Sequence, residues 1–349
     1  MKSIRCLCAI LLVLVMVFSL VACGDSGTVD QTADTARETQ PITIRLASLA
    51  SRGGVSTEFM YQFADALAAK TDKFVVELYP GGQFGNANEM VNAVQTNILQ
   101  GVVFTTSWIS GLCPIVEAIA VPYLFPDHET CVKILNQGID VITNGFQEAN
   151  LYPGCWLANG VYWTYSTTPI NEVSDLRGLN IRTPATDINN DVCEAYGANL
   201  VNLTTADVPV ALQQGAIDAT FAPLSVGYSS FLGSFQYMIR IHGDAYNSPD
   251  CFILSNEFLQ SLSEEDRTLF LETAMEVSYG DSYNFYLECL DMYMETIIED
   301  GVQVIPDSEE LHAQMREVLM PVKENYPTKY PNLADGYYQI VAAVEAYTN

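Results

Sequence analysis

The chain has 349 residues, of which 15 are lysine or arginine and 42 are aspartate or glutamate, so its formal net charge is −27. Nucleic-acid binding and attachment to anionic lipid through a basic patch both need clustered positive charge, and this composition excludes both. Hydrophobic residues make up 49% of the chain and aromatic residues 11%, which excludes a disordered protein and, at this length, predicts about two domains.

The N-terminus has the pattern of an export signal. Lys2 and Arg5 precede an apolar run that ends at Ala22, and this order is typical of secretory signals. The run is marginally short for a transmembrane anchor, which needs about 20 apolar residues. We therefore expect a signal peptide over residues 1–22, whose removal makes the mature protein more acidic by two charges.

A lipid attachment site is predicted directly after this signal. The sequence LVACG at residues 20–24 is similar to the lipobox of bacterial lipoproteins, in which the cysteine is lipidated and becomes the first mature residue. We expect this lipidation at Cys23 and a flexible tether over 23–40, because so polar a segment cannot bury surface. The mature protein is then expected on the outer face of the cytoplasmic membrane, at the cell surface or in the periplasm, and held there by its lipid only.

Strands and helices are predicted to alternate along the mature chain, which indicates an α/β fold with parallel strands. In its first half we expect strands at 41–49, 74–79 and 102–105, a helix capped by Ser56, and a helix over 87–100 that Gly101 ends. In its second half we expect strands at 179–183, 201–203 and 217–222 and a helix over 206–214 that Gly215 ends.

A long helix is predicted over residues 264–300. The segment contains no proline, its apolar residues follow helical spacing, and Ser263 with Asp266 resembles a capping box. A continuous helix of this length measures roughly 55 Å at 1.5 Å per residue, so it would brace both halves of the protein. A break at Gly280 is the competing interpretation.

Catalytic and metal-binding patterns are lacking in the sequence. The three histidines, His128, His242 and His312, are isolated from one another and from cysteine or carboxylate clusters, and no metal, phosphate-loop or nucleophile motif occurs. We expect no enzyme activity, no cofactor and no metal site. The export signal permits disulfides, but buried free thiols are favoured for the six cysteines beyond the lipid site, which are Cys113, Cys131, Cys155, Cys193, Cys251 and Cys289.

One arginine is a candidate ligand-binding residue. Arg182 alternates with the apolar Leu179 and Ile181 in a strand that Pro184 ends, so it lies at the carboxyl end of that strand. Ligands of open α/β sheets bind at this edge, and a guanidinium can hold a carboxylate by two parallel hydrogen bonds. An ordinary ion pair with a surface acid such as Asp187 is the alternative, and the spacing alone favours it.

From about Ile42 onward the chain resembles the solute-binding proteins of tripartite ATP-independent periplasmic (TRAP) transporters, of the C4-dicarboxylate-binding type. The matching segments occur in the family's order, and DLRGLNIRTP is the most specific of them. They are GQFG at 82–85 with Glu89, AVPYLF at 120–125, DLRGLNIRTP at 175–184, GAN at 197–199, ALQQGAID at 211–218 and LSEED at 262–266.

The resemblance implies a two-lobed fold of the periplasmic-binding-protein kind (type II), with two α/β domains joined by hinge strands and braced by one long helix. The domains it implies are 41–159 plus 248–287 and 160–247 plus 288–349. It also implies capture of a small organic acid, with Arg182 pairing with the ligand carboxylate, and delivery to a sodium-coupled permease of one small and one large membrane subunit. We expect the binding protein itself to be a monomer.

Departures from the family pattern point to a particular ligand class. Where many relatives have a second arginine this chain has Tyr162, and Phe221 and Ala222 replace polar recognition residues. These changes disfavour dicarboxylates and sugar acids, whose buried polar groups would be left unpaired. We therefore predict a monocarboxylate with an apolar or aromatic body, stacked on Trp108, Tyr162 or Phe221. Two alternatives for these residues stay open, because each aromatic could serve only in core packing and Arg52 could supply a second cation.

Three other functions are weaker predictions. A binding lipoprotein of an ATP-driven importer has a similar two-lobed shape and would be distinguished by an ATPase among its genomic neighbours. An exported enzyme acting on a carboxylated substrate would show turnover, but the sequence offers no catalytic cluster. A structural surface protein has no use for an arginine at a strand edge.

Overall fold

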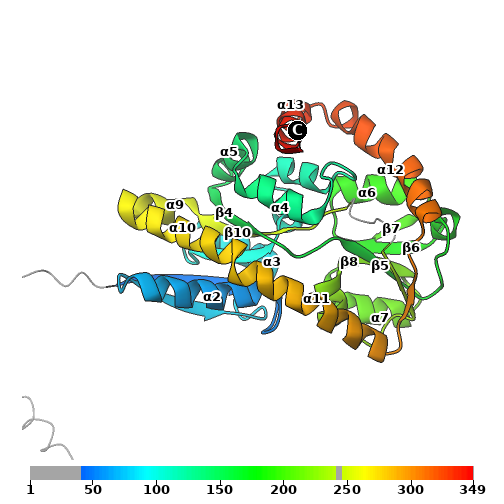
Figure 1. Cartoon of the computed structure of the whole chain (residues 1–349), viewed down its shortest axis with the longest axis horizontal. Helices are drawn as coiled ribbons and strands as arrows, with labels where there is room; N and C mark the ends of the chain where they lie inside the picture. Colours follow the sequence, from blue (N-terminus) through cyan, green and yellow to red (C-terminus); the bar gives the residue numbers. More distant parts are fainter. Residues whose placement is uncertain (1–40, 241–245, 349) are drawn as a thin grey trace, which may run out of the picture. The chain divides into compact units, whose positions relative to one another are not determined.

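The computed structural model describes residues 41–240 and 246–348, and residues 41–349 form one compact unit (Figure 1). The predicted signal peptide, Cys23, the tether and His242 lie outside the described residues. None of the helices described is both long and apolar enough to cross a bilayer.

The first sheet has five strands in the order β2-β1-β3-β10-β4. Strand β1 pairs in parallel with β2 and β3, as predicted, but β10 pairs antiparallel with both β3 and β4. The sheet is therefore mixed, and a strand from late in the chain lies inside it. The strands are β1 (Ile42–Ser48), β2 (Phe74–Tyr79), β3 (Gly101–Thr105), β4 (Leu151–Leu157) and β10 (Asp250–Ser255).

The second sheet has six strands in the order β11-β9-β5-β8-β6-β7. Strand β6 pairs in parallel with β7 and β8, whereas β5 pairs antiparallel with β8 and β9. The strands are β5 (Tyr162–Ser166), β6 (Asn180–Thr183), β7 (Asn199–Asn202), β8 (Ala219–Pro223), β9 (Tyr237–Ile239) and β11 (Gln303–Ile305).

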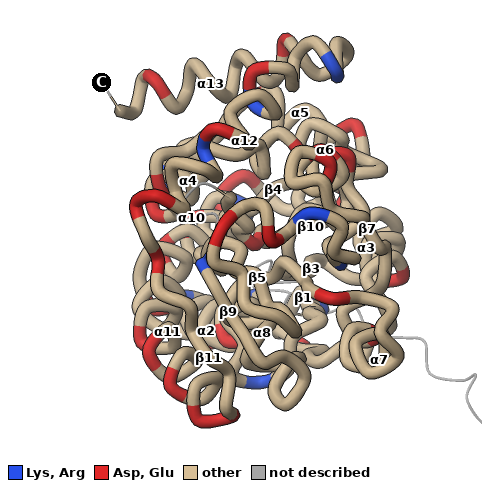
Figure 2. Tube along the Cα trace, turned by 90° about the vertical axis from the view of Figure 1, so that its right-hand side faces the viewer, with Lys and Arg blue, Asp and Glu red and all other residues tan. Residues whose placement is uncertain are grey.

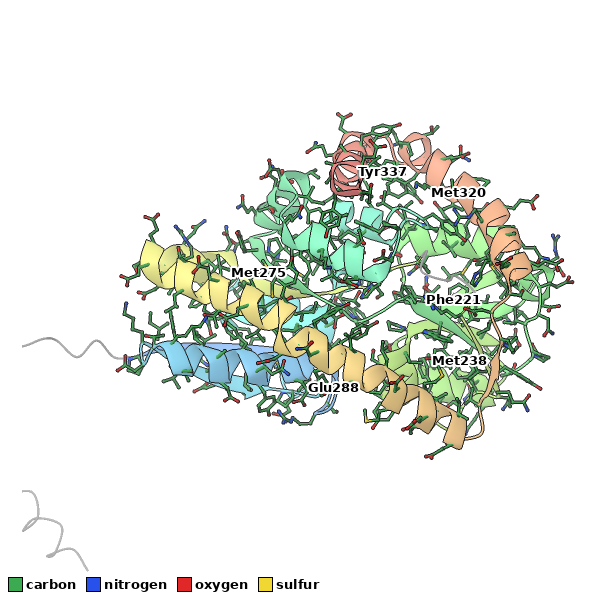
Figure 3. The ribbon with its side chains drawn as sticks, viewed as in Figure 1. Phe221, Met238, Met275, Glu288, Met320 and Tyr337 are labelled. Atoms are coloured by element: carbon green, nitrogen blue, oxygen red, sulfur yellow. The ribbon has the colours of Figure 1, made fainter. Side chains whose placement is uncertain are left out.

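Helices cover both faces of each sheet and enclose four buried cores. Figure 3 labels a side chain in or against each: Tyr337 and Met275 for the first sheet, Phe221 and Met238 for the second. The α-helices are α2 (Val55–Lys70), α3 (Ala87–Gln95), α4 (His128–Asn136), α5 (Asp140–Glu148), α6 (Asp187–Ala195), α7 (Val208–Gln213), α8 (Leu224–Ser230), α9 (Asn256–Ser261), α10 (Glu264–Tyr279), α11 (Asp281–Glu299), α12 (Glu309–Lys329) and α13 (Ala334–Thr348). Two 3₁₀ helices matter for the site, η1 (Thr106–Ile109) and η2 (Pro114–Ala120).

The predicted long helix is interrupted, so the continuous helix was wrong and the break at Gly280 is what the structure has. Helices α10 and α11 follow each other along one side of the fold, and Gly280 between them has φ −96° and ψ −102° (Figure 1). A side chain here would come within about 3.0 Å of the Glu276 carbonyl oxygen, so glycine permits this bend. Helix α10 packs on α2 and β4, and α11 packs on α8, so the pair still spans both sheets.

Two predicted helix ends were also wrong. Helix α3 ends at Gln95 rather than at Gln100, because Asn97 adopts a positive φ of 56° and the chain leaves the helix there. Gly101 consequently opens β3. Helix α2 is capped by Gly54 rather than by Ser56, whose hydroxyl donates instead to Asp250.

The cysteines and the charges agree with the sequence. All six described cysteines are buried free thiols, as favoured, and they are Cys113, Cys131, Cys155, Cys193, Cys251 and Cys289. Acidic residues are spread over the helices, notably along α11, whereas basic residues are few and scattered (Figure 2). Over the part of the chain that the structure describes, this distribution gathers no cluster of basic residues for a polyanion.

Candidate functional site

Arg182 lies near the carboxyl end of β6, between Val201 of β7 and Thr220 of β8. Its residue is only 3% exposed. Its Nε donates to the Leu203 carbonyl oxygen at 3.0 Å, and its Nη2 donates to Thr205 Oγ1 at 3.1 Å. Since a guanidinium has five N–H donors, most of its donor capacity is left over.

This arginine forms no ion pair with any carboxylate of the described residues, Asp187 included. Burial lowers the pKa of Arg182, which is the expected effect of taking a cation out of water. Buried charges in proteins are ordinarily paired. The site therefore has the electrostatic character of a place for an anion.

Tyr162, at the start of β5, is buried beside this cation. Its ring packs against Tyr246 with the centroids 4.7 Å apart. Burial raises the pKa of the Tyr162 hydroxyl, while a hydrogen bond with Ser248 and the charge of Arg182 act against that rise. The hydroxyl is thus close enough to Arg182 to respond to its charge.

Phe221 and Ala222, both predicted in the site, point to opposite faces of the second sheet. Side chains alternate along a strand, and Phe221 packs in the core that contains Tyr196 whereas Ala222 packs in the core that contains Tyr165. Trp108 in η1 is partly buried against the first sheet's core.

Arg52 lies on the surface. Its side chain is 58% exposed, its Nε is 3.2 Å from Glu58 Oε1, and its guanidinium covers the Tyr61 ring at 3.7 Å. Its charge is therefore already engaged by a carboxylate and an aromatic face.

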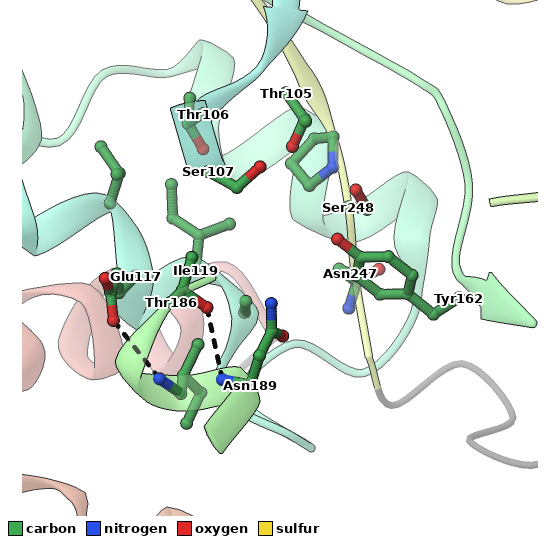
Figure 4. A pocket seen from close by; sticks show the side chains of 14 residues that line it. Thr105, Thr106, Ser107, Glu117, Ile119, Tyr162, Thr186, Asn189, Asn247 and Ser248 are labelled. Atoms are coloured by element: carbon green, nitrogen blue, oxygen red, sulfur yellow. Dashed lines mark hydrogen bonds between the residues drawn. The ribbon is translucent and has the colours of Figure 1, made fainter. Parts of the chain in front are cut away.

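A small cavity of about 30 Å³ lies where the two sheets' strand ends approach each other (Figure 4). Of the residues predicted in the site, only Tyr162 lines it. The other lining residues come from the end of β3 and η1, from η2, from the start of α6 and from the segment before β10. They are Thr105, Thr106, Ser107, Val116, Glu117, Ile119, Ala120, Thr186, Ile188, Asn189, Asn247, Ser248 and Pro249.

Hydroxyl and amide groups dominate the polar part of this lining. Ser107 Oγ is buried and has no hydrogen-bond partner among the described residues. The only acid in the lining, Glu117, accepts hydrogen bonds from the backbone N–H groups of Asp187 and Ile188 at 3.0 and 3.3 Å. Figure 4 shows the second of these bonds. Burial and the charge of Asp187 raise the pKa of Glu117. This carboxylate ties η2, on the first sheet's side, to the start of α6, on the second sheet's side.

Sequence reasoning missed most of this lining. The one local signal was Thr105-Thr106-Ser107, three hydroxyl residues that directly follow the buried strand β3. Carboxyl ends of parallel strands are where α/β folds bind ligands, so this run was identifiable in principle. Thr186, Asn189, Asn247 and Ser248 reach the cavity only through long-range packing.

A profile of the family described as bacterial extracellular solute-binding protein, family 7, matches residues 46–329. The 2,3-diketo-L-gulonate-binding periplasmic protein of Escherichia coli (strain K12) is 26% identical over 272 residues, which cover 74% of this chain and 81% of that protein.

Solved structures share the fold. A TRAP periplasmic solute-binding protein from Desulfovibrio desulfuricans with bound sn-glycerol-3-phosphate superposes with a TM-score of 0.79 at 22% identity, covering 88% of this chain and 98% of that one. Another, from Roseobacter denitrificans with bound β-D-glucuronate, has a TM-score of 0.77 at 23% identity and covers 86% and 99% of the two chains. The two-lobed α/β periplasmic-binding-protein architecture is thus common to all three.

Proposed function

The chain belongs to family 7 of the bacterial extracellular solute-binding proteins, which serve TRAP transporters. From this membership we propose that it captures a small organic acid through Arg182 and delivers it to a TRAP permease of one small and one large subunit. Proteins of this family bind solutes outside the cytoplasm and are not enzymes. An ATP-driven importer is therefore not the partner we propose.

The observation that supports this proposal most is the state of Arg182. It is a cation that is 3% exposed, lies at the ligand-binding edge of a sheet, and has no carboxylate partner among the described residues. A ligand carboxylate would supply that partner through two parallel hydrogen bonds. The cavity of about 30 Å³ is far smaller than a ligand pocket, which measures roughly 300 Å³ or more. Binding therefore requires the two halves of the fold, each one sheet with its helices, to move apart and then close around the ligand.

We propose a ligand with a single carboxylate. Arg182 does not itself line the cavity, but it lies beside Tyr162, which does. No other lysine or arginine is placed there, since none lines the cavity and Arg52 is engaged at the surface by Glu58, so a second carboxylate would be buried without a cation. This argues against the C4-dicarboxylates for which the family type is named.

The body of the ligand is proposed to carry hydroxyl groups. Ser107 Oγ, which has no partner among the described residues, would stay unpaired beside an apolar body, and the side chains of Thr105, Thr106, Asn189 and Ser248 offer further hydrogen-bonding groups. The apolar or aromatic body predicted from the sequence keeps support only from Tyr162, because Phe221 and Trp108 are absent from the cavity lining that the structure describes.

A panel of acids tests this specificity by thermal unfolding. We expect D-glucuronate and other hydroxylated monocarboxylates to stabilise the purified protein by about 2.7 kcal/mol at 100 times the dissociation constant. Succinate, with two carboxylates, and phenylacetate, with an apolar body, should have little effect at equal concentration. Stabilisation by succinate alone would contradict the single-carboxylate proposal, and stabilisation by phenylacetate alone would restore the apolar body.

We further propose that Cys23 carries the lipid that holds the mature protein at the membrane. The support is the LVACG sequence at 20–24 and the polar segment that follows it. Cys23→Ser is expected to move the protein from the membrane fraction to the soluble fraction, with Cys113→Ser as the control that leaves it in place because Cys113 is a buried thiol. A Cys23→Ser protein that stays in the membrane fraction would refute the anchor.

A further inference from the structure

The chain passes between the two sheets through the segment that joins β4 to β5 and through the segment that precedes β10. These two segments lie side by side and are hydrogen-bonded to each other. Their contacts are the bridge between Val161 and Asn247 and two backbone bonds of 3.1 Å, Tyr162 N to Tyr246 O and Ser248 N to Gly160 O. Since Tyr162, Asn247 and Ser248 line the cavity, these segments determine its shape.

Asn159 connects this pair of segments to three surrounding elements. Its backbone N–H donates to Nε2 of His128 on α4 at 3.2 Å, and its side-chain Nδ2 donates to Oδ1 of Asp250 at 3.1 Å. Its Oδ1 accepts from the hydroxyl of Ser225 on α8 at 2.7 Å. Helix α8 packs on the second sheet, whereas α4 and Asp250 belong to the first sheet's side.

Asp250 completes a chain of hydrogen bonds across the fold. It is 2% exposed, its Oδ2 accepts from the hydroxyl of Ser56 on α2 at 2.5 Å, and its Oδ1 accepts from Asn159. The chain therefore runs from Ser225 on α8, through Asn159 and Asp250, to Ser56 on α2. Every contact in it is polar and buried or partly buried.

Within residues 41–240 and 246–348, no cation compensates the Asp250 carboxylate. Among the described residues it has no ion pair, and the elements packed on it contribute Ser56 from α2, Thr105 from β3 and Leu157 from β4. The titratable groups that respond to its charge are Tyr162 and Cys251, whose pKa values burial raises, so both are neutral. His128, beyond Asn159, is kept neutral by burial, which lowers its pKa to about 4.

We propose that Asp250 is a positioning residue for ligand binding: its two carboxyl oxygens accept from Asn159 and Ser56 and so hold the closed arrangement of the two connecting segments. This inference rests on the proposed function, because it concerns closure around a ligand. Asp250 does not itself line the cavity, whereas the preceding Ser248 and Pro249 do. Opening the fold breaks the Ser225–Asn159 bond and lets water reach the carboxyl group.

Closure is consequently linked to proton uptake, which becomes substantial only as the pH falls toward 6. Burial raises the pKa of Asp250 to about 6 in the closed form, against the ordinary value of 3.8 that a hydrated carboxyl group has. A fall in pH from 7.5 to 5.5 therefore favours the closed form. Among the described residues, the His128 ring forms hydrogen bonds with Asn159, Gly160 and Asn247 of the connecting segments, and it stays neutral over this range.

Distances between two spin labels test the proposal without any ligand. One label is placed on Ala69→Cys in α2, on the first sheet's side, and the other on Val210→Cys in α7, on the second sheet's side. Both positions are exposed, and the distance between the labels measures how far apart the two sides lie. The buried native thiols, whose pKa values are raised, should not react. With the purified full chain, in which Cys6, Cys8 and Cys23 are replaced by serine so that they take up no label, we expect the short-distance population to grow at least twofold from pH 7.5 to 5.5.

Three substitutions complete the experiment. Asp250→Asn should abolish the pH dependence, Ser225→Ala should reduce the short-distance population at every pH, and the exposed control Asp72→Asn should behave as the unsubstituted chain. The proposal would be overturned if the short-distance population did not change with pH, or if it changed equally in the unsubstituted chain and in Asp250→Asn. No ligand is added in this experiment, so a negative result contradicts only the role of Asp250 in closure. The proposed function would instead be contradicted if no acid in the panel stabilised the protein.

Discussion

Replacing Arg182 by alanine is expected to weaken binding of the organic acid at least 100-fold, as measured by titration calorimetry with whichever acid stabilises the protein. The ligand carboxylate would be enclosed without its cation, and breaking one side of a buried ion pair costs about 3–5 kcal/mol. A 100-fold change corresponds to about 2.7 kcal/mol, so the stated loss is a lower limit.

The unliganded variant should stay folded. Alanine removes the two hydrogen bonds to Leu203 O and Thr205 Oγ1, but it also removes a buried, unpaired charge, and these effects act in opposite directions on stability. Arg182→Lys keeps a charge but loses the planar fork, so we expect it to bind about tenfold more weakly than the parent.

Arg52→Ala is the matched control. It removes an exposed arginine that pairs with Glu58 on the surface, and exposed pairs contribute little. We expect binding to change less than twofold. Strong loss of binding in Arg52→Ala, with binding retained in Arg182→Ala, would show that the wrong arginine was assigned.

Arg182 was predictable because its position depends on local sequence. Alternation of Leu179 and Ile181 with polar residues, ended by Pro184, indicates a strand end, and a strand end of a parallel sheet is a ligand-binding edge. Alternation along a strand also bears on Phe221 and Ala222, which were both predicted to line the ligand site. Because side chains alternate along β8, two adjacent residues could not both face one cavity.

The cavity itself could not be derived from local pattern. Thr186 opens α6, Asn247 precedes β10, and Glu117 lies in η2, so their meeting depends on packing between segments far apart in the chain. The antiparallel insertion of β10 between β3 and β4 is equally non-local. The bend at Gly280 was foreseen as an alternative, but the apolar spacing of 264–300 is the same for a straight and for a bent helix.

Between pH 7 and pH 4, two buried groups are expected to change the free energy of unfolding in opposite directions, by about 3 kcal/mol for His128 and about 2 kcal/mol for Asp250. Burial lowers the pKa of His128 to about 4 from the ordinary 6.5, so the stability that neutral His128 contributes is present above pH 6.5 and is lost as the pH falls toward 4. Burial raises the pKa of Asp250 to about 6 from 3.8, so its contribution is present below pH 3.8 and is lost as the pH rises through 6.

Single substitutions should separate the two contributions in urea unfolding followed from pH 7 to pH 4. Relative to the unsubstituted chain, Asp250→Asn should lose about 2 kcal/mol as the pH falls, because only the parent gains from protonating Asp250. His128→Gln should show the reverse, gaining about 3 kcal/mol relative to the parent. Val210→Gln, at an exposed position of α7 that does not titrate, is the control, and its difference from the parent should vary by less than about 0.5 kcal/mol.

The opposite slopes follow from one arrangement of atoms. His128 Nε2 must be unprotonated to accept from the N–H groups of Asn159 and Gly160, at 3.2 and 2.9 Å, whereas Asp250 is buried beside the same Asn159 with no cation to balance its charge. Lowering the pH therefore protonates His128 Nε2, which can then no longer accept a hydrogen bond from Asn159. It also neutralises the buried Asp250 carboxylate, whose charge destabilises the fold. If both variants changed with pH in the same direction, this account of the connecting segments would be wrong. Opposite slopes would show that the titrations of His128 and Asp250, on either side of Asn159, compensate each other. The free energy of unfolding would then change little with pH while protonation of Asp250 favours the closed form.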